Sequence, residues 1–345
     1  MREQAIDFVM LWVDGNDPEW KKEKSKYNSL LTENNAADNG DCRFRDWDNL
    51  QYWFRGVEKY AGWVNKVYFI TNGQKPAWLN LDAEKLVFVK HTDFIDADAL
   101  PTFNSHVIEL NLHRIKGLSD NFVYFNDDTF ITDYLQRELF FVNNVPVHPA
   151  ELRPIIVNRD DSLLLAHVYT NMIHIINKNF SMRESIKANR SKWFFPKNCS
   201  LKPMILNIML SQYRAFPGFR SYHLPVPVQK RTMEEVWSKE FEVLNETTRH
   251  RFRTSEDVSQ FLFRYWDLAS GHFVPIRGNR LGKYYGLDEN NESVLNTACN
   301  AIEESWHRMI CINDCYESYV YFEEAKSRIN SALEKLLPNK SSFEL

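Results

Sequence analysis

Polar side chains that could do chemistry follow an apolar run in the segment Phe122–Asp128, which reads FVYFNDD. The aromatic and β-branched residues predict a buried strand, with Asn126, Asp127 and Asp128 at its carboxyl end. In open α/β sheets, ligands bind at the carboxyl ends of the strands. Two adjacent carboxylates there could hold Mg²⁺ or Mn²⁺, which prefer oxygen ligands. An Asx turn that closes the strand is the alternative interpretation.

Two further apolar runs also end in polar turn residues. The first leads into Asp14 and Gly15, and the second leads into Asn72 and the glycine after it. Asp14 could bond a ribose or a base edge, or help to place a metal. Simple turn chemistry also explains each segment. Because the three strand ends should converge on one edge of the sheet, we expect a nucleotide diphosphate and its metal to sit there.

Cations and a helix start add candidates in the first half. Arg43 and Arg45 could clamp phosphate oxygens, or they could pair with surface carboxylates. Asn104 opens a predicted helix, where it could bind an anion or a sugar, or simply cap the helix. Glu109 lies further along the same helix and could face the site.

The second half offers a histidine and an arginine cluster. His223 is a candidate proton acceptor, because phosphoryl transfer needs a base near neutral pKa. Arg253 is the last residue of the cluster Arg249–Arg253, and its positive charge could neutralise the negative charge of a phosphate. A structural histidine and a solvated arginine face are the alternatives. The basic and aromatic run Lys187–Lys197 could grip an anionic polymer or a membrane surface, or form a solvated helix end.

The elements that must position these groups alternate between strands and helices in the first 150 residues, which favours a mostly parallel α/β sheet. The predicted strands are Ile6–Val13, Lys66–Thr71, Lys85–Val89, Phe122–Phe125 and Leu139–Val142, and the predicted helices are Trp47–Tyr60 and Asn104–Ile115. Helices are then predicted over Leu163–Phe180, Met233–Thr247, Ser255–Ala269 and Tyr316–Leu337, with capping boxes at Thr232–Glu235 and Thr254–Asp257. We expect a core at 1–150 and a helical region at 151–345 that together form one catalytic unit.

Composition excludes several classes of protein. The 345 residues carry a formal charge of −4, so the basic footprint of a nucleic-acid-binding protein is absent. The sequence has no apolar run of the roughly 18 residues that span a bilayer, and it shows no secretory signal pattern. The five cysteines are scattered, which disfavours a disulfide framework or a zinc site. We therefore expect a cytoplasmic protein.

Taken together, these segments resemble the Stealth family of sugar-1-phosphate transferases. That family includes bacterial capsule polymerases and the catalytic subunits of lysosomal-enzyme N-acetylglucosamine-1-phosphotransferase. The likeness rests on the blocks Ile6–Trp20, Arg43–Ile131, His223–Asp257 and Cys311–Asp314. The second block is long and specific and contains ITNGQ, LPTFNS and NDD. Cys315 departs from the family pattern, which has Asn or Asp there, and residues 145–215 match only loosely.

The resemblance implies a Rossmann-like, GT-A-related nucleotide-sugar core with a mostly helical C-terminal region. It also implies transfer of a sugar 1-phosphate from a nucleotide diphosphosugar, typically UDP-linked, to a hydroxyl of a carbohydrate acceptor. A phosphodiester of a capsular or cell-surface polysaccharide forms, and a nucleoside monophosphate leaves. The enzyme is then expected at the inner face of the membrane, alone or with an export complex, and without a nucleic-acid partner.

The family's functional positions fall on five residues of this chain: Glu109, Asn126, Asp128, His223 and Arg253. Our hypothesis is that His223 accepts the proton of the attacking hydroxyl while Arg253 neutralises charge on the transferred phosphoryl group. Asp127 and Asp128 would hold Mg²⁺ or Mn²⁺. Asn126 and Glu109 would orient the donor or the acceptor. The expected lining of the substrate site is Asp14, Gly15, Arg43, Asn72 and Asn104.

Two other functions remain open at the level of the sequence. A conventional metal-dependent GT-A glycosyltransferase would bind the same diphosphate, but it would form a glycosidic bond and release the nucleoside diphosphate. A carbohydrate-binding or scaffold protein without catalysis would use the chain's many aromatic residues for sugar stacking.

Overall fold

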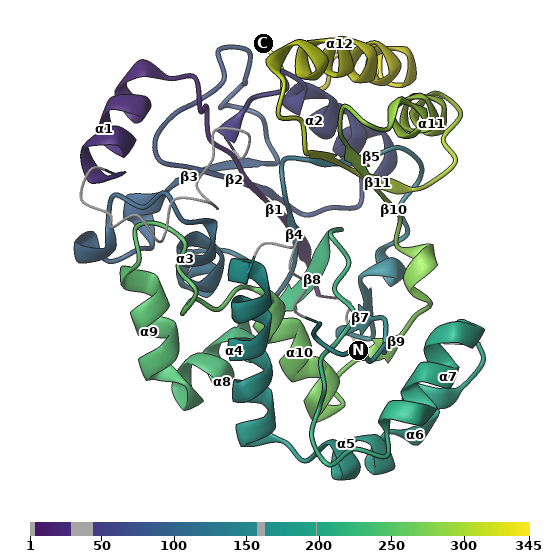
Figure 1. The fold of residues 1–345 in the computed structure, drawn as a ribbon. Helices are drawn as coiled ribbons and strands as arrows, with labels where there is room; N and C mark the ends of the chain where they lie inside the picture. The colour runs from purple at the N-terminus through teal and green to yellow at the C-terminus, as the bar shows by residue number, and fades with distance from the viewer. Residues whose placement is uncertain (1–3, 29–43, 157–162, 198) are drawn as a thin grey trace.

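The computed structural model describes residues 4–28, 44–156, 163–197 and 199–345. Its main sheet contains five strands in the order β3-β2-β1-β4-β8 (Figure 1). The strands are β1 (Ile6–Leu11), β2 (Val67–Thr71), β3 (Leu86–Lys90), β4 (Asn121–Phe125) and β8 (Val226–Gln229). The first four are parallel, and β8 pairs with β4 in the antiparallel direction. The prediction of a mostly parallel α/β sheet is confirmed.

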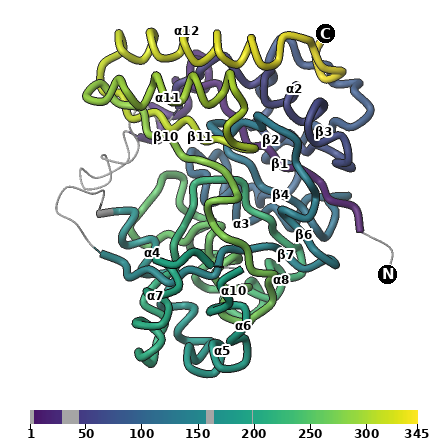
Figure 2. Tube along the Cα trace, turned by 90° about the vertical axis from the view of Figure 1, so that its right-hand side faces the viewer, coloured from purple at the N-terminus to yellow at the C-terminus, as the bar shows by residue number. Residues whose placement is uncertain are grey.

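Both faces of this sheet are buried, and side chains alternate between them. Phe8 and Met10 on β1 pack into one hydrophobic core, whereas Val9 between them packs into the other. Helices α2 (Leu50–Tyr60), α11 (Glu292–Glu303) and α12 (Tyr319–Leu336) cover the first face. Helices α3 (Ser105–Leu110), α4 (Leu163–Asn179), α8 (Lys230–Lys239) and α10 (Phe261–Ser270) cover the second (Figures 1 and 2). Strands that are covered on both faces consist of nearly continuous apolar runs, and such runs can be recognised in the sequence.

Two small sheets complete the architecture. One has the order β10-β11-β5, built from β10 (Lys283–Leu287), β11 (Met309–Asp314) and β5 (Thr129–Ile131). The other has the order β6-β7-β9, built from β6 (Phe141–Val142), β7 (Val145–His148) and β9 (Val274–Pro275). Strands from the second half therefore pair with strands from the first. The division at residue 150 stays a prediction.

The remaining helices are α1 (Pro18–Asn28), α5 (Met182–Ala188), α6 (Arg190–Phe194), α7 (Leu201–Leu210) and α9 (Phe241–Arg249). The helix expected over 233–247 is two helices, α8 and α9, separated at Glu240. The helix expected over 104–115 ends at Leu110, because the amide of Asn111 turns back to donate to Val107 O and to Thr248 Oγ1. Of the four residues expected to form a strand over 139–142, only the last two do so, as β6.

The two predicted capping boxes do not start helices. Helix α8 begins at Lys230, and Thr232 Oγ1 donates to Asp267 Oδ1 at 3.0 Å instead of capping it. The backbone nitrogen of Thr254 does donate to Asp257 Oδ2, at 3.2 Å. That segment is nevertheless a turn, and α10 begins only at Phe261. The reason is that Asp257 also accepts bonds from residues outside the segment, described below.

Among the described residues, no helix combines the length and the apolar character that a bilayer crossing requires.

Candidate active site

Three distant segments of the chain meet at the carboxylate of Asp128, in the turn between β4 and β5. His223 Nε2, from the loop before β8, lies 3.1 Å from Asp128 Oδ2. Cys311 Sγ, on β11, donates to the same oxygen at 3.2 Å. Thr129 Oγ1 donates to Oδ1 at 3.1 Å. The pairing of β11 with β5 fixes this meeting, since Ile312 N also donates to Asp128 O at 2.8 Å.

The imidazole of His223 lies between an amide and a carboxylate. Its Nε2 is 3.0 Å from Asn126 Nδ2 as well as 3.1 Å from Asp128 Oδ2. When Nε2 carries a proton it can donate to Asp128, and when it is bare it can accept from the Asn126 amide. Both protonation states therefore have a partner in place. The side chain of His223 is 43% exposed, so an incoming group can reach it.

Charge couples the protonation of this pair. The negative charge of Asp128 raises the pKa of His223, and burial opposes that shift only in part. Burial by itself would raise the pKa of Asp128, but the charge of His223 and the bonds from His223, Cys311 and Thr129 lower it. The structure thus favours an ionised carboxylate beside a histidine that binds its proton more tightly than usual.

Behind Asn126, a buried tyrosine connects the turn to helix α3. Tyr124 OH lies 2.6 Å from Asn126 Oδ1 and 3.1 Å from Glu109 Oε1. Gln260 N donates to the other oxygen of Glu109 at 3.4 Å. Glu109 therefore reaches the histidine through Tyr124 and Asn126. Burial first, and then the charge of Glu109, raise the pKa of Tyr124 far above its usual value, so it stays a phenol.

Tyr124 was not predicted from the sequence. It lies two residues before Asn126, and alternate residues of a strand share one face. That spacing is the signal which could have identified it.

The carboxylates around the turn repel one another. The side chain of Asp127 is exposed to solvent on one side, but nearby protein atoms desolvate it in part. This desolvation, together with the charges of Asp128 and Asp46, raises the pKa of Asp127 to about 7. Burial raises the pKa of Asp46, and the charges of Asp48 and Asp14 add to the shift. A divalent cation would relieve this repulsion, so the acidic oxygens of Asp127 and Asp128 fit Mg²⁺ or Mn²⁺. Ligand atoms of Asp128, His223 and Cys311 also lie within 4.8 Å of one another, but nitrogen and sulfur suit softer metals than Mg²⁺.

Arg253 lies at the amino end of helix α3, where its Nη2 donates to Ser105 Oγ at 2.9 Å. A buried carboxylate, Asp257, fixes the segment that carries it. Asp257 accepts a bond from Asn104 Nδ2 at 2.8 Å and contacts His250 Nδ1 at 2.7 Å. The same helix thus carries the Arg253 contact at its first residue and Glu109 in its last turn.

Two predicted ligand groups are engaged by the protein itself. Asn104 is fully buried, and its Oδ1 accepts from His106 N at 3.1 Å, as expected of a helix cap. Its amide donates to Asp257 Oδ2, so the side chain is engaged within the protein, and the binding role expected for it stays a prediction. Arg45 forms a two-point ion pair with Asp314 at 3.1 Å for each contact, which is a carboxylate pairing of the kind that the sequence left as the alternative to a phosphate clamp. Arg43 lies outside the described residues.

The turns after β1 and β2 are joined by Gln74. Its Oε1 accepts from Asp14 N and its Nε2 donates to Asp14 O, both at 3.0 Å. Asp14 Oδ1 accepts from Asn16 N, which is an Asx turn, and Asn72 Oδ1 accepts from Gln74 N at 3.3 Å. The two strand ends therefore converge, as predicted.

The close approach of two loops explains the glycine at position 15. A Cβ at this position would lie 1.8 Å from the carbonyl oxygen of Phe44. Only glycine lets the two loops approach this closely.

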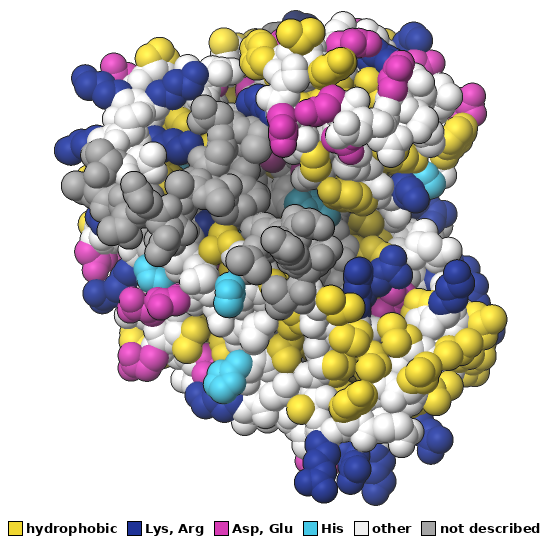
Figure 3. All heavy atoms as spheres, in the orientation of Figure 1, with side chains coloured by type: hydrophobic (Ala, Val, Ile, Leu, Met, Phe, Trp, Pro, Cys, Tyr) yellow, Lys and Arg dark blue, Asp and Glu magenta, His cyan; other side chains and the backbone are white. Residues whose placement is uncertain are grey.

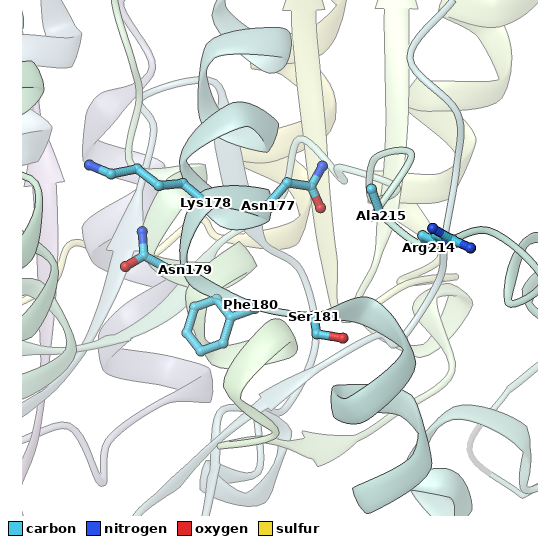
Figure 4. A pocket seen from close by; sticks show the side chains of 7 residues that line it. All are labelled: Asn177, Lys178, Asn179, Phe180, Ser181, Arg214 and Ala215. Atoms are coloured by element: carbon cyan, nitrogen blue, oxygen red, sulfur yellow. The ribbon is translucent and has the colours of Figure 1, made fainter.

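Two surface pockets lie elsewhere. One of about 290 Å³ is lined by residues at the end of α4 and in the link to α5, together with Arg214 and Ala215 (Figure 4). Its polar groups are engaged in the protein: Asn177 pairs with the backbone of Phe216, and Lys178 pairs with Glu240. The other, of about 580 Å³, lies at the opposite edge of the sheet beside Ile6 and Lys85. Neither contains the groups around Asp128.

Comparison with known proteins finds the family that the sequence resembles. Residues 4–31 match Stealth protein CR1, conserved region 1, and residues 43–148 match Stealth protein CR2, conserved region 2. The chain is 42% identical to "Capsular polysaccharide phosphotransferase WcwK" of Streptococcus pneumoniae, over 99% of this chain and 98% of that protein. It is 37% identical to "Receptor polysaccharide phosphotransferase WefC" of Streptococcus gordonii, over 99% of each. It is 36% identical to "Exopolysaccharide phosphotransferase cps2G" of Lactiplantibacillus plantarum, over 98% of this chain and 96% of that protein. Because these relatives match along nearly their whole length, the chain belongs to the Stealth protein family.

Proposed function

We propose that this Stealth protein is a transferase that moves a sugar 1-phosphate from a nucleotide diphosphosugar to a carbohydrate hydroxyl in the synthesis of a surface polysaccharide. The names of its full-length relatives, which are capsular, receptor and exopolysaccharide phosphotransferases, support this activity. The observation that carries the proposal is the position of His223 Nε2 between the Asn126 amide and the Asp128 carboxylate.

The reaction needs a base and a stabilised phosphoryl group. The acceptor oxygen attacks the phosphorus that bears the sugar, the bond from that phosphorus to the bridging oxygen breaks, and the nucleoside monophosphate leaves. The acceptor hydroxyl would replace the Asn126 amide at the unprotonated Nε2 of His223 and give its proton to that nitrogen, from which Asp128 then accepts a hydrogen bond. A base of this kind contributes about 10²–10⁴-fold to the rate. Its raised pKa makes the unprotonated ring a stronger proton acceptor and also keeps a larger share of the resting histidine protonated.

The other groups act on charge and orientation. Arg253 neutralises charge on the transferred phosphoryl oxygens. Glu109, acting through Tyr124, keeps Asn126 in position. Asp127 and Asp128 would hold Mg²⁺ or Mn²⁺, which would neutralise the diphosphate when bound. Asp14, Gly15 and Asn72 would then lie at the nucleotide end.

We also propose a fold type, a donor and a place of action for this enzyme. We take the parallel strands β3-β2-β1-β4 as a Rossmann-like, GT-A-related core, because the acidic groups gather at their carboxyl edge. A uridine nucleotide is our proposed donor. The enzyme would work at the inner face of the membrane.

Product analysis tests the proposal. The protein is incubated with a panel of nucleotide sugars, Mg²⁺ and saccharide acceptors, and the released nucleotide is identified by chromatography. We expect UMP and a phosphodiester. Release of UDP with formation of a glycosidic bond would establish the glycosyltransferase instead. Binding of a nucleotide sugar by calorimetry without any turnover would indicate a carbohydrate-binding protein.

Two substitutions test the assigned roles. His223→Ala and Arg253→Ala are each expected to abolish turnover while the far-ultraviolet circular dichroism stays unchanged. Rates like that of the unmodified protein in both variants would refute the roles of these side chains.

A further inference from the structure

Helix α7 turns apolar side chains toward solvent. Leu201, Ile205, Ile208 and Met209 are 67%, 48%, 49% and 64% exposed. Their spacing of four, three and one residues places them on one face of the helix. Phe195 before the helix and Tyr213 after it are exposed as well. We call these six side chains the α7 patch.

The opposite face of the helix is held in the protein by a polar anchor. Asn207 is fully buried, and its amide donates to Ala150 O at 2.8 Å and to Trp193 O at 3.2 Å. Its Oδ1 accepts from Leu152 N at 2.8 Å. Surface helices normally bury their apolar face and expose their polar one. Helix α7 buries Leu210 beside Asn207 but leaves a second apolar face exposed, and the Asn207 bonds fix it in that orientation.

Basic residues surround the α7 patch. Residues 181–220 include eight Lys and Arg but one acidic residue, Glu184, in a chain whose formal charge is −4. Exposed members of this set are Arg183, Lys187, Arg190, Lys197, Lys202, Arg214 and Arg220. Figure 3 shows the hydrophobic side chains gathered over α6 and α7, with Lys and Arg along the edges of the cluster. The region thus combines an apolar centre with a cationic rim.

We propose that the α7 patch docks on the surface of an anionic lipid bilayer. The apolar side chains enter the boundary between head groups and acyl chains, and the surrounding Lys and Arg contact the lipid phosphates. Charge argues against a second copy of the chain as the occupant, because two such faces would bring their cationic rims together. The inference rests on the proposed function in so far as it gives a surface for work at the inner face of the membrane, but its test needs no nucleotide-sugar donor.

Flotation with vesicles tests the proposal without any substrate. We expect the protein to float with vesicles that contain roughly one third phosphatidylglycerol and to stay behind with pure phosphatidylcholine. Binding should fall steeply at about 0.5 M NaCl, because salt screens the charges. The triple variant Leu201→Ser, Ile205→Ser, Met209→Ser should lose about tenfold or more in vesicle affinity.

Matched variants separate this effect from misfolding. The control variant Tyr319→Ser, Val320→Ser, Tyr321→Ser alters three exposed hydrophobic side chains on α12 and should bind vesicles normally. The charge variant Lys187→Glu, Lys202→Glu keeps the apolar face and should also lose binding, so the test stands even if the triple variant unfolds.

Two results would overturn the proposal. One is vesicle binding that is absent, or equal for all variants. The other is self-association in sedimentation that only the patch variants abolish, without lipid binding. Release of nucleotide in the absence of vesicles should be unchanged in the patch variants, so failure of the docking proposal and failure of the proposed function give different results.

Discussion

Replacing Tyr124 by Phe removes one buried hydroxyl that touches two groups of the site. The phenol lies 2.6 Å from Asn126 Oδ1 and 3.1 Å from Glu109 Oε1. Without it, the buried carboxylate of Glu109 keeps a long bond from Gln260 N at 3.4 Å. An unsatisfied buried polar group costs about 1–3 kcal/mol, so the free energy of unfolding should fall by that amount.

The same substitution should lower kcat and leave KM nearly unchanged. Asn126 would be free to rotate, and His223 Nε2 would lose the amide that supports its unprotonated state. A loss of about 1.4–2.7 kcal/mol in transition-state stabilisation corresponds to a ten- to hundredfold fall in kcat. Urea titration measures the stability, and nucleotide release measures the rate.

A second tyrosine provides the matched control. Tyr68 is buried on β2, which is separated from β4 by β1, and it faces the same core as Tyr124. Tyr68→Phe should therefore leave kcat unchanged. If Tyr124→Phe also kept the kcat of the unmodified protein, the reasoning that connects Glu109 to His223 through the phenol would be refuted.

Three further predictions concern charge and packing. Asp127→Asn should raise the Mg²⁺ concentration for half-maximal activity by about tenfold or more, as seen in a metal titration. The pKa of His250 is raised, mainly by its bond to Asp257, so its stabilisation is complete below the unfolded value of 6.5 and is lost as the pH rises through the folded pKa. His250→Gln should accordingly flatten the melting temperature across that range, and an unchanged slope would contradict the assignment. Gly15→Ala should destabilise the fold by about 1–3 kcal/mol, because the added carbon would overlap the Phe44 carbonyl. A melting temperature equal to that of the unmodified protein would show that the loop moves freely.

The sequence identified the parallel strands because burial on both faces demands uninterrupted apolar runs. It did not identify β8, where Pro227 argues against a strand. The structure resolves this conflict by placing β8 at the edge of the sheet, antiparallel to β4.

The site was predicted in part for similar reasons. Asp128 stands out because it follows a strand, and His223 came from the family resemblance and from its titration range. Tyr124 was missed because it lies within an apolar strand and resembles a core residue. Cys311 was named only as the start of a family block, and no role was assigned to it. The sequence could not name the partner of Arg45, because Asp314 lies 269 residues away. Such pairs depend on the tertiary fold and leave no local pattern.

The meeting of β11 with β5 has a consequence for how the protein is made. Asp128 emerges from the ribosome long before Cys311, whose thiol donates to it. A nascent chain that has been synthesised only through α10 already carries Asn126 and His223, yet β5 has no neighbouring strand on the β11 side. The acidic turn therefore receives its final neighbour late in translation, after more than three hundred residues have been joined.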